Sequence, residues 1–182
     1  KINTGEMIHD IRGAALPKGS IGYKTGDFVA NNFSTVKAAL RPVLSVASVA
    51  QSVLGDKGVE AVGSALHKAG VPLWTPYMPK AYYPHQISQT ASPRKVVYFP
   101  SCINQTMGHT AKGGVKTPLL DKTVELIQKA GFEVIFPKNM KNLCCGTIWE
   151  SKGMLDIADR KSKELEDALY EASEKGKYPI LC

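Results

Sequence analysis

The sequence predicts an α/β protein in which an N-terminal helical segment is followed by a Rossmann-like β-α-β-α-β parallel sheet. Three regions with different patterns support this prediction. Residues 1–70 repeat apolar residues at helical spacing, residues 71–93 are rich in proline, and residues 94–182 alternate short β-branched runs with long amphipathic stretches. Strands that alternate with helices in this order require parallel pairing and right-handed crossovers. We therefore expect a helical segment, a linker and an α/β domain.

The first seventy residues predict three helices. Asn3 or Thr4 is positioned to cap a short helix over residues 6–12. A second helix is expected over residues 34–54, with a kink or break near Pro42, and a third over residues 56–68. The inward face of the second helix is predicted to hold Val36, Leu40, Val43, Leu44, Ala47, Ala50 and Leu54.

The proline-rich stretch over residues 71–93 predicts an extended linker. Pro72, Pro76, Pro79 and Pro84 disfavour a regular helix in this stretch and favour polyproline geometry. Its aromatic residues either bind a partner or anchor the linker across the surface of the next domain.

The last region predicts three strands separated by two helices. The strands are expected over residues 95–99, 132–136 and 178–181, and the first two are each followed by proline. The helices are expected over residues 118–130 and 148–173, with Leu119 and Leu155 among their inward residues.

Composition narrows the classes of function. The chain has 182 residues, a formal net charge of +7 and 43% hydrophobic residues, which is enough for a packed core. Lysine and arginine are scattered singly, so we do not expect nucleic-acid binding, whereas peripheral contact with an anionic membrane surface stays open. The sequence has no run of eighteen apolar residues, and we expect no transmembrane helix and a cytoplasmic location.

All four cysteines come after predicted strands. Cys102 comes after the first strand, Cys144 and Cys145 come after the second, and Cys182 comes at the end of the third. Because the carboxyl ends of parallel strands open on one edge of a sheet, we expect the four thiols to converge there. Thiolates select zinc or iron–sulfur clusters, and the absence of C-x-x-C knuckles favours iron and sulfide over zinc.

Two residues near the cysteine pair are expected to support a bound group. Gly146 permits a tight turn after Cys144 and Cys145, and Lys152, with Lys138 and Lys141, is placed to offset the negative charge of thiolates or a cluster. The alternatives are that these lysines are only solvated and that the cysteines fill a corner of the core.

Two motifs carry a resemblance to a known family. F-P-S-C-I-N-Q-T-M-G at residues 99–108 and N-L-C-C-G-T-I-W-E-S-K-G at residues 142–153 resemble the cysteine-rich CCG domain of iron–sulfur oxidoreductases. The match is closest to the C-terminal region of bacterial FAD-linked D-lactate dehydrogenase-like proteins and covers residues 95–182. The opening I-N-T-G-E-M-I is similar to the residues that come after the ferredoxin-like segment in that family, so the chain is expected to be a fragment.

The resemblance implies a 2-hydroxy acid oxidoreductase that passes electrons from FAD through 4Fe-4S clusters to a quinone or another acceptor. FAD and the ferredoxin-like clusters belong to other domains of the same polypeptide, and Cys102, Cys144 and Cys145 take ligand positions in this one. Cys182 is either a ligand or a neighbour of one that lies beyond it. With an incomplete ligand set, the isolated chain is expected to hold no intact cluster and to be inactive alone. A heterodisulfide-reductase-like subunit and a zinc-stabilised interaction domain are the alternatives.

Overall fold

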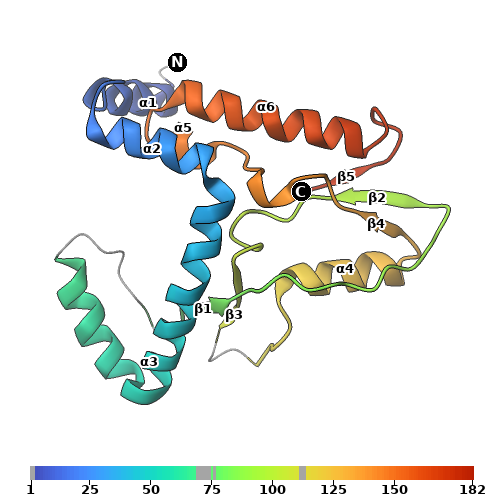
Figure 1. The fold of residues 1–182 in the computed structure, drawn as a ribbon, viewed down its shortest axis with the longest axis horizontal. Helices are drawn as coiled ribbons and strands as arrows, with labels where there is room; N and C mark the ends of the chain where they lie inside the picture. The colour runs from blue at the N-terminus through green and yellow to red at the C-terminus, as the bar shows by residue number, and fades with distance from the viewer. Residues whose placement is uncertain (1–2, 69–74, 76, 111–113) are drawn as a thin grey trace.

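The computed structural model of the chain describes residues 3–68, 75, 77–110 and 114–182. It is a mixed helix and sheet protein, 55% helical, whose N-terminal segment consists of helices (Figure 1). In chain order the elements are α1 (Thr4–Ala15), α2 (Ile21–Asn31), α3 (Phe33–His67), β1 (Pro79–Ala81), β2 (Lys95–Tyr98), β3 (Met107–Thr110), α4 (Leu119–Lys129), β4 (Glu133–Ile135), η1 (Met140–Asn142), α5 (Thr147–Glu150), α6 (Leu155–Ala172) and β5 (Ile180–Leu181).

The first two helices each begin after an N-cap residue whose side chain accepts backbone hydrogen bonds. The Asn3 side chain accepts hydrogen bonds from the backbone N–H groups of Gly5 and Glu6, which confirms the predicted cap of α1. Ser20 caps α2 in the same way through the N–H of Tyr23. Helix α2 was not predicted from the sequence, although Ser20 is a typical N-cap residue.

Of the kink or break predicted near Pro42, the break is wrong. Helix α3 continues through Pro42, and its one residue with non-helical backbone angles is Gly55, at φ 65° and ψ −178°. Glycine adopts this combination because it has no Cβ. As a result the predicted second and third helices form two arms of α3 that meet at Gly55 (Figure 1).

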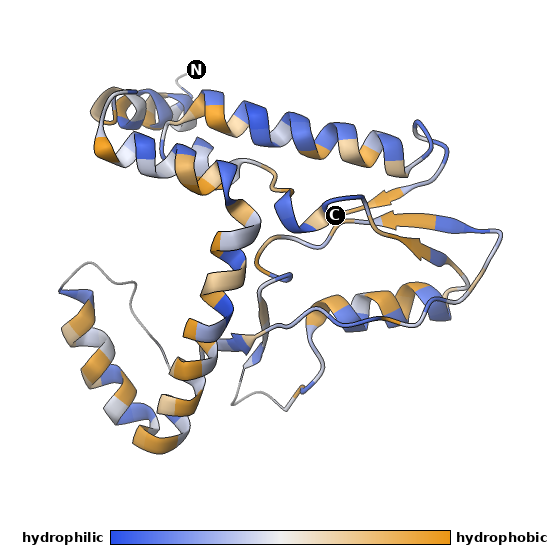
Figure 2. Cartoon of the chain, viewed as in Figure 1, coloured by the Kyte–Doolittle hydropathy of each residue, from blue (hydrophilic) through white to orange (hydrophobic). Residues whose placement is uncertain are grey.

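The predicted inward face of α3 is only partly right. Leu44 is buried and Val36, Ala47 and Ala50 are half-buried, but Leu40, Val43 and Leu54 are exposed. The buried residues of the helix are Phe33, Lys37, Leu44, Gln51, Val59 and Gly63. Figure 2 shows apolar residues on the arms of α3 where they extend away from the sheet. By length and composition α3 is the one helix in the described part of the chain that is long and apolar enough to cross a membrane, which is weak evidence for a span.

The three strands predicted for the last region pair in parallel. Strand β2 is central in the order β4-β2-β5, with Val96 opposite Val134 and Val97 opposite Ile180. Helices α6 and α4 lie on opposite sides of this sheet (Figure 1). The face toward α4 is packed by Tyr82, Val96, Tyr98, Leu120, Val124, Ile127 and Val134. Leu119 and Leu155, both expected inward, are exposed.

A second, two-stranded sheet was not predicted. Strands β1 and β3 pair antiparallel, with Pro79 opposite Thr110 and Ala81 opposite Met107. Strand β1 therefore lies within the stretch that was expected to be an extended linker. The part of that linker over residues 71–74 and 76, with Pro72 and Pro76, lies outside the described residues.

The long helix expected over residues 148–173 is two helices. The short α5 ends at Glu150, and α6 begins at Leu155 after a turn in which Gly153 has a φ of 78°. The turn lies against α1, where a Cβ on Gly153 would meet the backbone nitrogen of Gly13 at 2.2 Å. This turn places Trp149 and Met154 in a core shared with Ala30, Phe33, Cys144, Ile157 and Ala158.

Candidate functional site

The loops after β2 and β4 bring Cys102 and Cys144 together. Cys144 is buried, and Cys102 packs against the same core and is half-buried. Each thiol is the first cause of the pKa shift of the other, through a hydrogen bond between the two side chains. We call the Cys102 and Cys144 side chains the thiol pair. Its two members lie far apart in sequence and meet because parallel strands precede both loops.

The hydrogen bond makes the two thiols unequal. The pKa of Cys102 is lowered, first by the hydrogen bond from Cys144 and further by the positive charge of Lys37, although burial opposes the shift. The pKa of Cys144 is raised by the same hydrogen bond and by burial. The pair therefore favours a state in which Cys102 is the thiolate and Cys144 holds the proton, the arrangement of a nucleophile or a soft-metal ligand.

The other two cysteines do not join the pair. Cys145 is exposed, and its Sγ donates to Oγ1 of Thr147 at 3.4 Å. Cys182 comes directly after β5 and is also exposed, with a pKa raised by partial burial. Over residues 3–68, 75, 77–110 and 114–182, no group of three or more cysteine, histidine, aspartate or glutamate side chains is arranged to hold a metal ion.

Gly146 shapes the loop that carries the cysteines. It is buried and has a φ of 88°, and a Cβ added to it would lie 2.5 Å from the carbonyl oxygen of Ala158. The loop therefore lies directly against α6 at this point. The close turn expected after the cysteines is present, and its contact is with α6.

The lysines singled out from the sequence lie on the surface. Lys138 pairs with Glu171, and Lys141 is exposed. Lys152 lines a shallow hollow of about 460 Å³ together with Arg12, Ala15, Leu16 and Ser151. Arg12 closes one side of this hollow by donating to the carbonyl oxygen of Ser151 at 2.5 Å.

The buried cations near the thiol pair are Lys37 and Lys161, and neither was predicted from the sequence to be buried. Lys37 lies on α3 and donates to Oε1 of Gln105 at 2.8 Å. Lys161 lies on α6, donates to the carbonyl oxygen of Asn142 at 3.0 Å and pairs with Glu164. Lys161 thus holds the segment that leads into Cys144.

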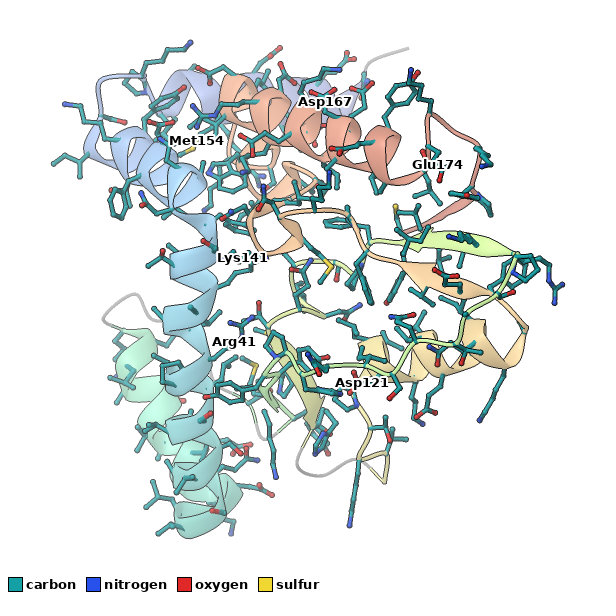
Figure 3. All side chains as sticks on the ribbon, turned by 45° about the vertical axis from the view of Figure 1, so that its right-hand side comes forward. Arg41, Asp121, Lys141, Met154, Asp167 and Glu174 are labelled. Carbon is teal, nitrogen blue, oxygen red and sulfur yellow. The ribbon has the colours of Figure 1, made fainter. Side chains whose placement is uncertain are left out.

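A signal for Lys37 was present in the sequence. Phe33, Lys37, Arg41 and Leu44 recur at spacings of three and four, which places them on one helix face. Figure 3 shows Arg41 on the side of α3 that faces the β1–β3 sheet. Its Nε donates to the carbonyl oxygen of Tyr82 at 2.9 Å, and its Nη2 donates to that of Gln105 at 3.1 Å. The cations were overlooked because the inward face was chosen by hydrophobicity alone.

Comparison with known proteins adds no relative. No family model matches the chain, and no curated protein or solved structure shows significant similarity to it. A function for this chain therefore has to be inferred from the geometry of the thiol pair and from the motifs that contain it.

Proposed function

We propose that this chain is the cluster-binding, electron-transfer part of an FAD-linked, D-lactate dehydrogenase-like oxidoreductase, built on a Rossmann-like β-α-β-α-β unit. The observation that carries the proposal is the contact between Cys102 and Cys144 across two loops that come after parallel strands. Catalysis of 2-hydroxy acid oxidation belongs to an FAD domain elsewhere in the polypeptide, and this chain alone is inactive. A quinone or another acceptor receives the electrons in the cytoplasm, at the inner face of the membrane.

The cysteine thiols are the right kind of ligand for an iron–sulfur cluster, but fewer of them come together than a cluster needs. Thiolates are the ligands of such clusters, and a bound cluster supplies one-electron transfer. Two of the four thiols meet in this structure, while Cys145 and Cys182 lie outside the pair. In the proposal Cys102, Cys144 and Cys145 supply three ligands, and Cys182 is either the fourth or a neighbour of it. Gly146 shapes the loop, and Lys152 offsets the negative charge.

Metal analysis tests the proposal in two lengths of the protein. The 182-residue chain, prepared without oxygen, is expected to contain much less than stoichiometric iron and acid-labile sulfide, because only two thiols converge. The longer polypeptide that includes the neighbouring domains is expected to bind iron and to lose one cluster's worth when Cys102 and Cys144 are both replaced by serine. The single change Cys182→Ser shows whether that residue is a ligand.

Three results would contradict this proposal or its parts. Stoichiometric iron in the 182-residue chain would show that the ligand set is already complete. Unchanged iron in the double serine variant of the longer polypeptide would remove the thiol pair from the site. One bound zinc and no iron would favour a zinc-stabilised interaction domain instead.

A thiol–disulfide oxidoreductase of the heterodisulfide-reductase type is the second candidate. The observation that favours it is that, among the described residues, the thiol pair is in direct contact without a third thiol. Such a pair, reduced, donates two electrons and two protons to a disulfide, releasing two thiols and forming a Cys102–Cys144 disulfide. In the same protein samples, an intramolecular disulfide formed on addition of a small disulfide, with no iron bound, would favour this candidate.

A further inference from the structure

Lys37 is a buried cation fixed beside the loop that carries Cys102. It is 5% exposed, and its Nζ donates to Oε1 of Gln105 at 2.8 Å. Gln105 is itself held, because its Nε2 donates to the carbonyl oxygen of Pro100 at 2.7 Å and its backbone N–H donates to that of Ser101. The side-chain oxygen of Gln105 is therefore committed to Lys37. The Phe33 ring lies 4.9 Å from the ammonium nitrogen and covers it on another side.

The charge of Lys37 has no carboxylate partner among the ion pairs of the described residues. Lys161, the other buried lysine at this site, differs because it pairs with Glu164. Burying an ammonium group without an opposite charge is costly, and burial lowers the pKa of Lys37 to about 8. The acidic groups that act against this lowering are the thiols of Cys102 and Cys144.

Arg41 adds a second positive charge on the same face of α3. Both of its hydrogen bonds go to carbonyl oxygens, those of Tyr82 and Gln105. These contacts hold α3 against the end of β1 and the loop from residue 100 to residue 106. The helix thus places a fixed cation, Lys37, against the loop that carries Cys102, from outside the segment that carries the cysteine motifs.

We propose that Lys37 is a positioning residue whose ammonium group is the built-in countercharge for the negative group held by the thiol pair. This inference rests on the proposed function, in which that group is a thiolate-bound iron–sulfur cluster; in the metal-free protein it is the Cys102 thiolate. A countercharge from α3 stabilises the anion and attracts anionic reagents to it. Lys37→Met keeps the length and burial of the side chain and removes the charge.

Two alkylating reagents of similar size and different charge test the inference without any metal. Iodoacetate is anionic and iodoacetamide is neutral, and both react with the same thiolate. Their rate ratio at Cys102 therefore reports the local potential, whatever fraction of the thiol is ionised. Lys37→Met is expected to lower the iodoacetate-to-iodoacetamide ratio about fivefold, because the anionic reagent loses the attraction of one unit charge. Peptide mapping by mass spectrometry separates Cys102 from the exposed cysteines.

Matched variants decide between an electrostatic and a merely structural role. Lys37→Arg keeps the charge and is expected to restore the ratio to near that of the wild type. Lys57→Met removes one charge from an exposed position of α3 and is expected to leave the ratio unchanged. An unchanged ratio in Lys37→Met, or an equal fall in Lys57→Met, would overturn the inference.

The longer, iron-loaded polypeptide gives an independent measurement. Removing a positive charge beside a cluster disfavours its reduction, so Lys37→Met is expected to lower the midpoint potential. A tenfold fall in the equilibrium constant for one-electron reduction corresponds to about 59 mV. If no iron binds, the proposed function fails while the alkylation result stands. If iron binds and the ratio is unchanged, the assignment of Lys37 fails alone.

Discussion

At the scale of single residues, Gly146 gives the sharpest test of how the cysteine loop is built. The backbone at this position has a φ of 88°, which residues with a Cβ rarely adopt. An added Cβ would also meet the carbonyl oxygen of Ala158 at 2.5 Å. Gly176 has nearly the same φ, 89°, but nothing lies within 4 Å of its added Cβ. We expect Gly176→Ala to cost about 1 kcal/mol from backbone strain. Gly146→Ala should cost clearly more, because α6 or the loop must also move.

Urea unfolding of both variants measures this difference. The comparison separates the backbone strain, which both variants share, from the contact with α6, which Gly146 makes and Gly176 does not. Equal losses in the free energy of unfolding would show that the loop moves away from α6 at little cost. The contact would then not be what positions Cys144 and Cys145.

Site residues that lie in sequence motifs were easier to predict than those brought to the site by the packing of a distant helix. The strand-loop pattern predicted that all four thiols converge, and of these Cys102 and Cys144 lie together while Cys145 and Cys182 do not join them. It did not identify Lys37, whose position depends on how α3 packs against the loop after β2. A lysine on a buried helix face also contradicts the hydrophobic pattern from which that face was inferred.

At the scale of elements, α3 shows why proline is a poor guide to a helix end. Pro42 lacks the N–H that would bond to the carbonyl of Ala38, yet the helix continues to Gly55. Its neighbours Arg41 and Leu44 are held in place by tertiary contacts, which outweigh the local preference. The predicted break reflected the local preference alone. Strands β2 and β4 were predicted better, because their β-branched runs also match their burial.

Replacing Pro42 is therefore expected to stabilise the protein. Pro42→Ala restores one hydrogen bond and removes a steric conflict, and we expect a gain of about 1 to 3 kcal/mol in the free energy of unfolding. Pro118→Ala is the control, since Pro118 caps the start of α4, where a missing N–H costs nothing. Its effect on unfolding by urea should be small. A loss of stability in Pro42→Ala would show that the proline bends α3 in a way its packing requires.

At the scale of the whole molecule, the N-terminal helices and the last helix share one core. Ala30 and Phe33 pack with Trp149, Met154 and Ile157. Figure 3 shows Met154 between the N-terminal helices and α6. The indole nitrogen of Trp149 donates to the carbonyl oxygen of Gly26 at 2.9 Å. This shared core was not predicted, because the division into regions was based on composition, which carries no information about packing between distant segments.

Polar contacts at Asp156 join the N-terminal helices to α6. They make the stability of this contact depend on pH. Asp156 pairs with Lys18 at 2.9 Å and accepts a hydrogen bond from the Tyr23 hydroxyl. Lys18, and then Tyr23, lower the pKa of Asp156 to about 2. A carboxyl group with a lowered pKa stabilises the folded state above its ordinary value of 3.8, and the contribution disappears as the pH falls through about 2.

Asp156→Asn is therefore expected to destabilise the protein in a pH-dependent way. Because the contact is half exposed, the loss should be no more than about 1 kcal/mol near neutral pH. The difference from the wild type should shrink as the pH is lowered from about 4 to about 2. Asp159→Asn, at an exposed position on the same helix, is the control and should give little difference at any pH. Urea unfolding at a series of pH values measures both. A difference for Asp156→Asn that stays constant down to about pH 2 would mean that the carboxylate charge does not hold the N-terminal helices against α6.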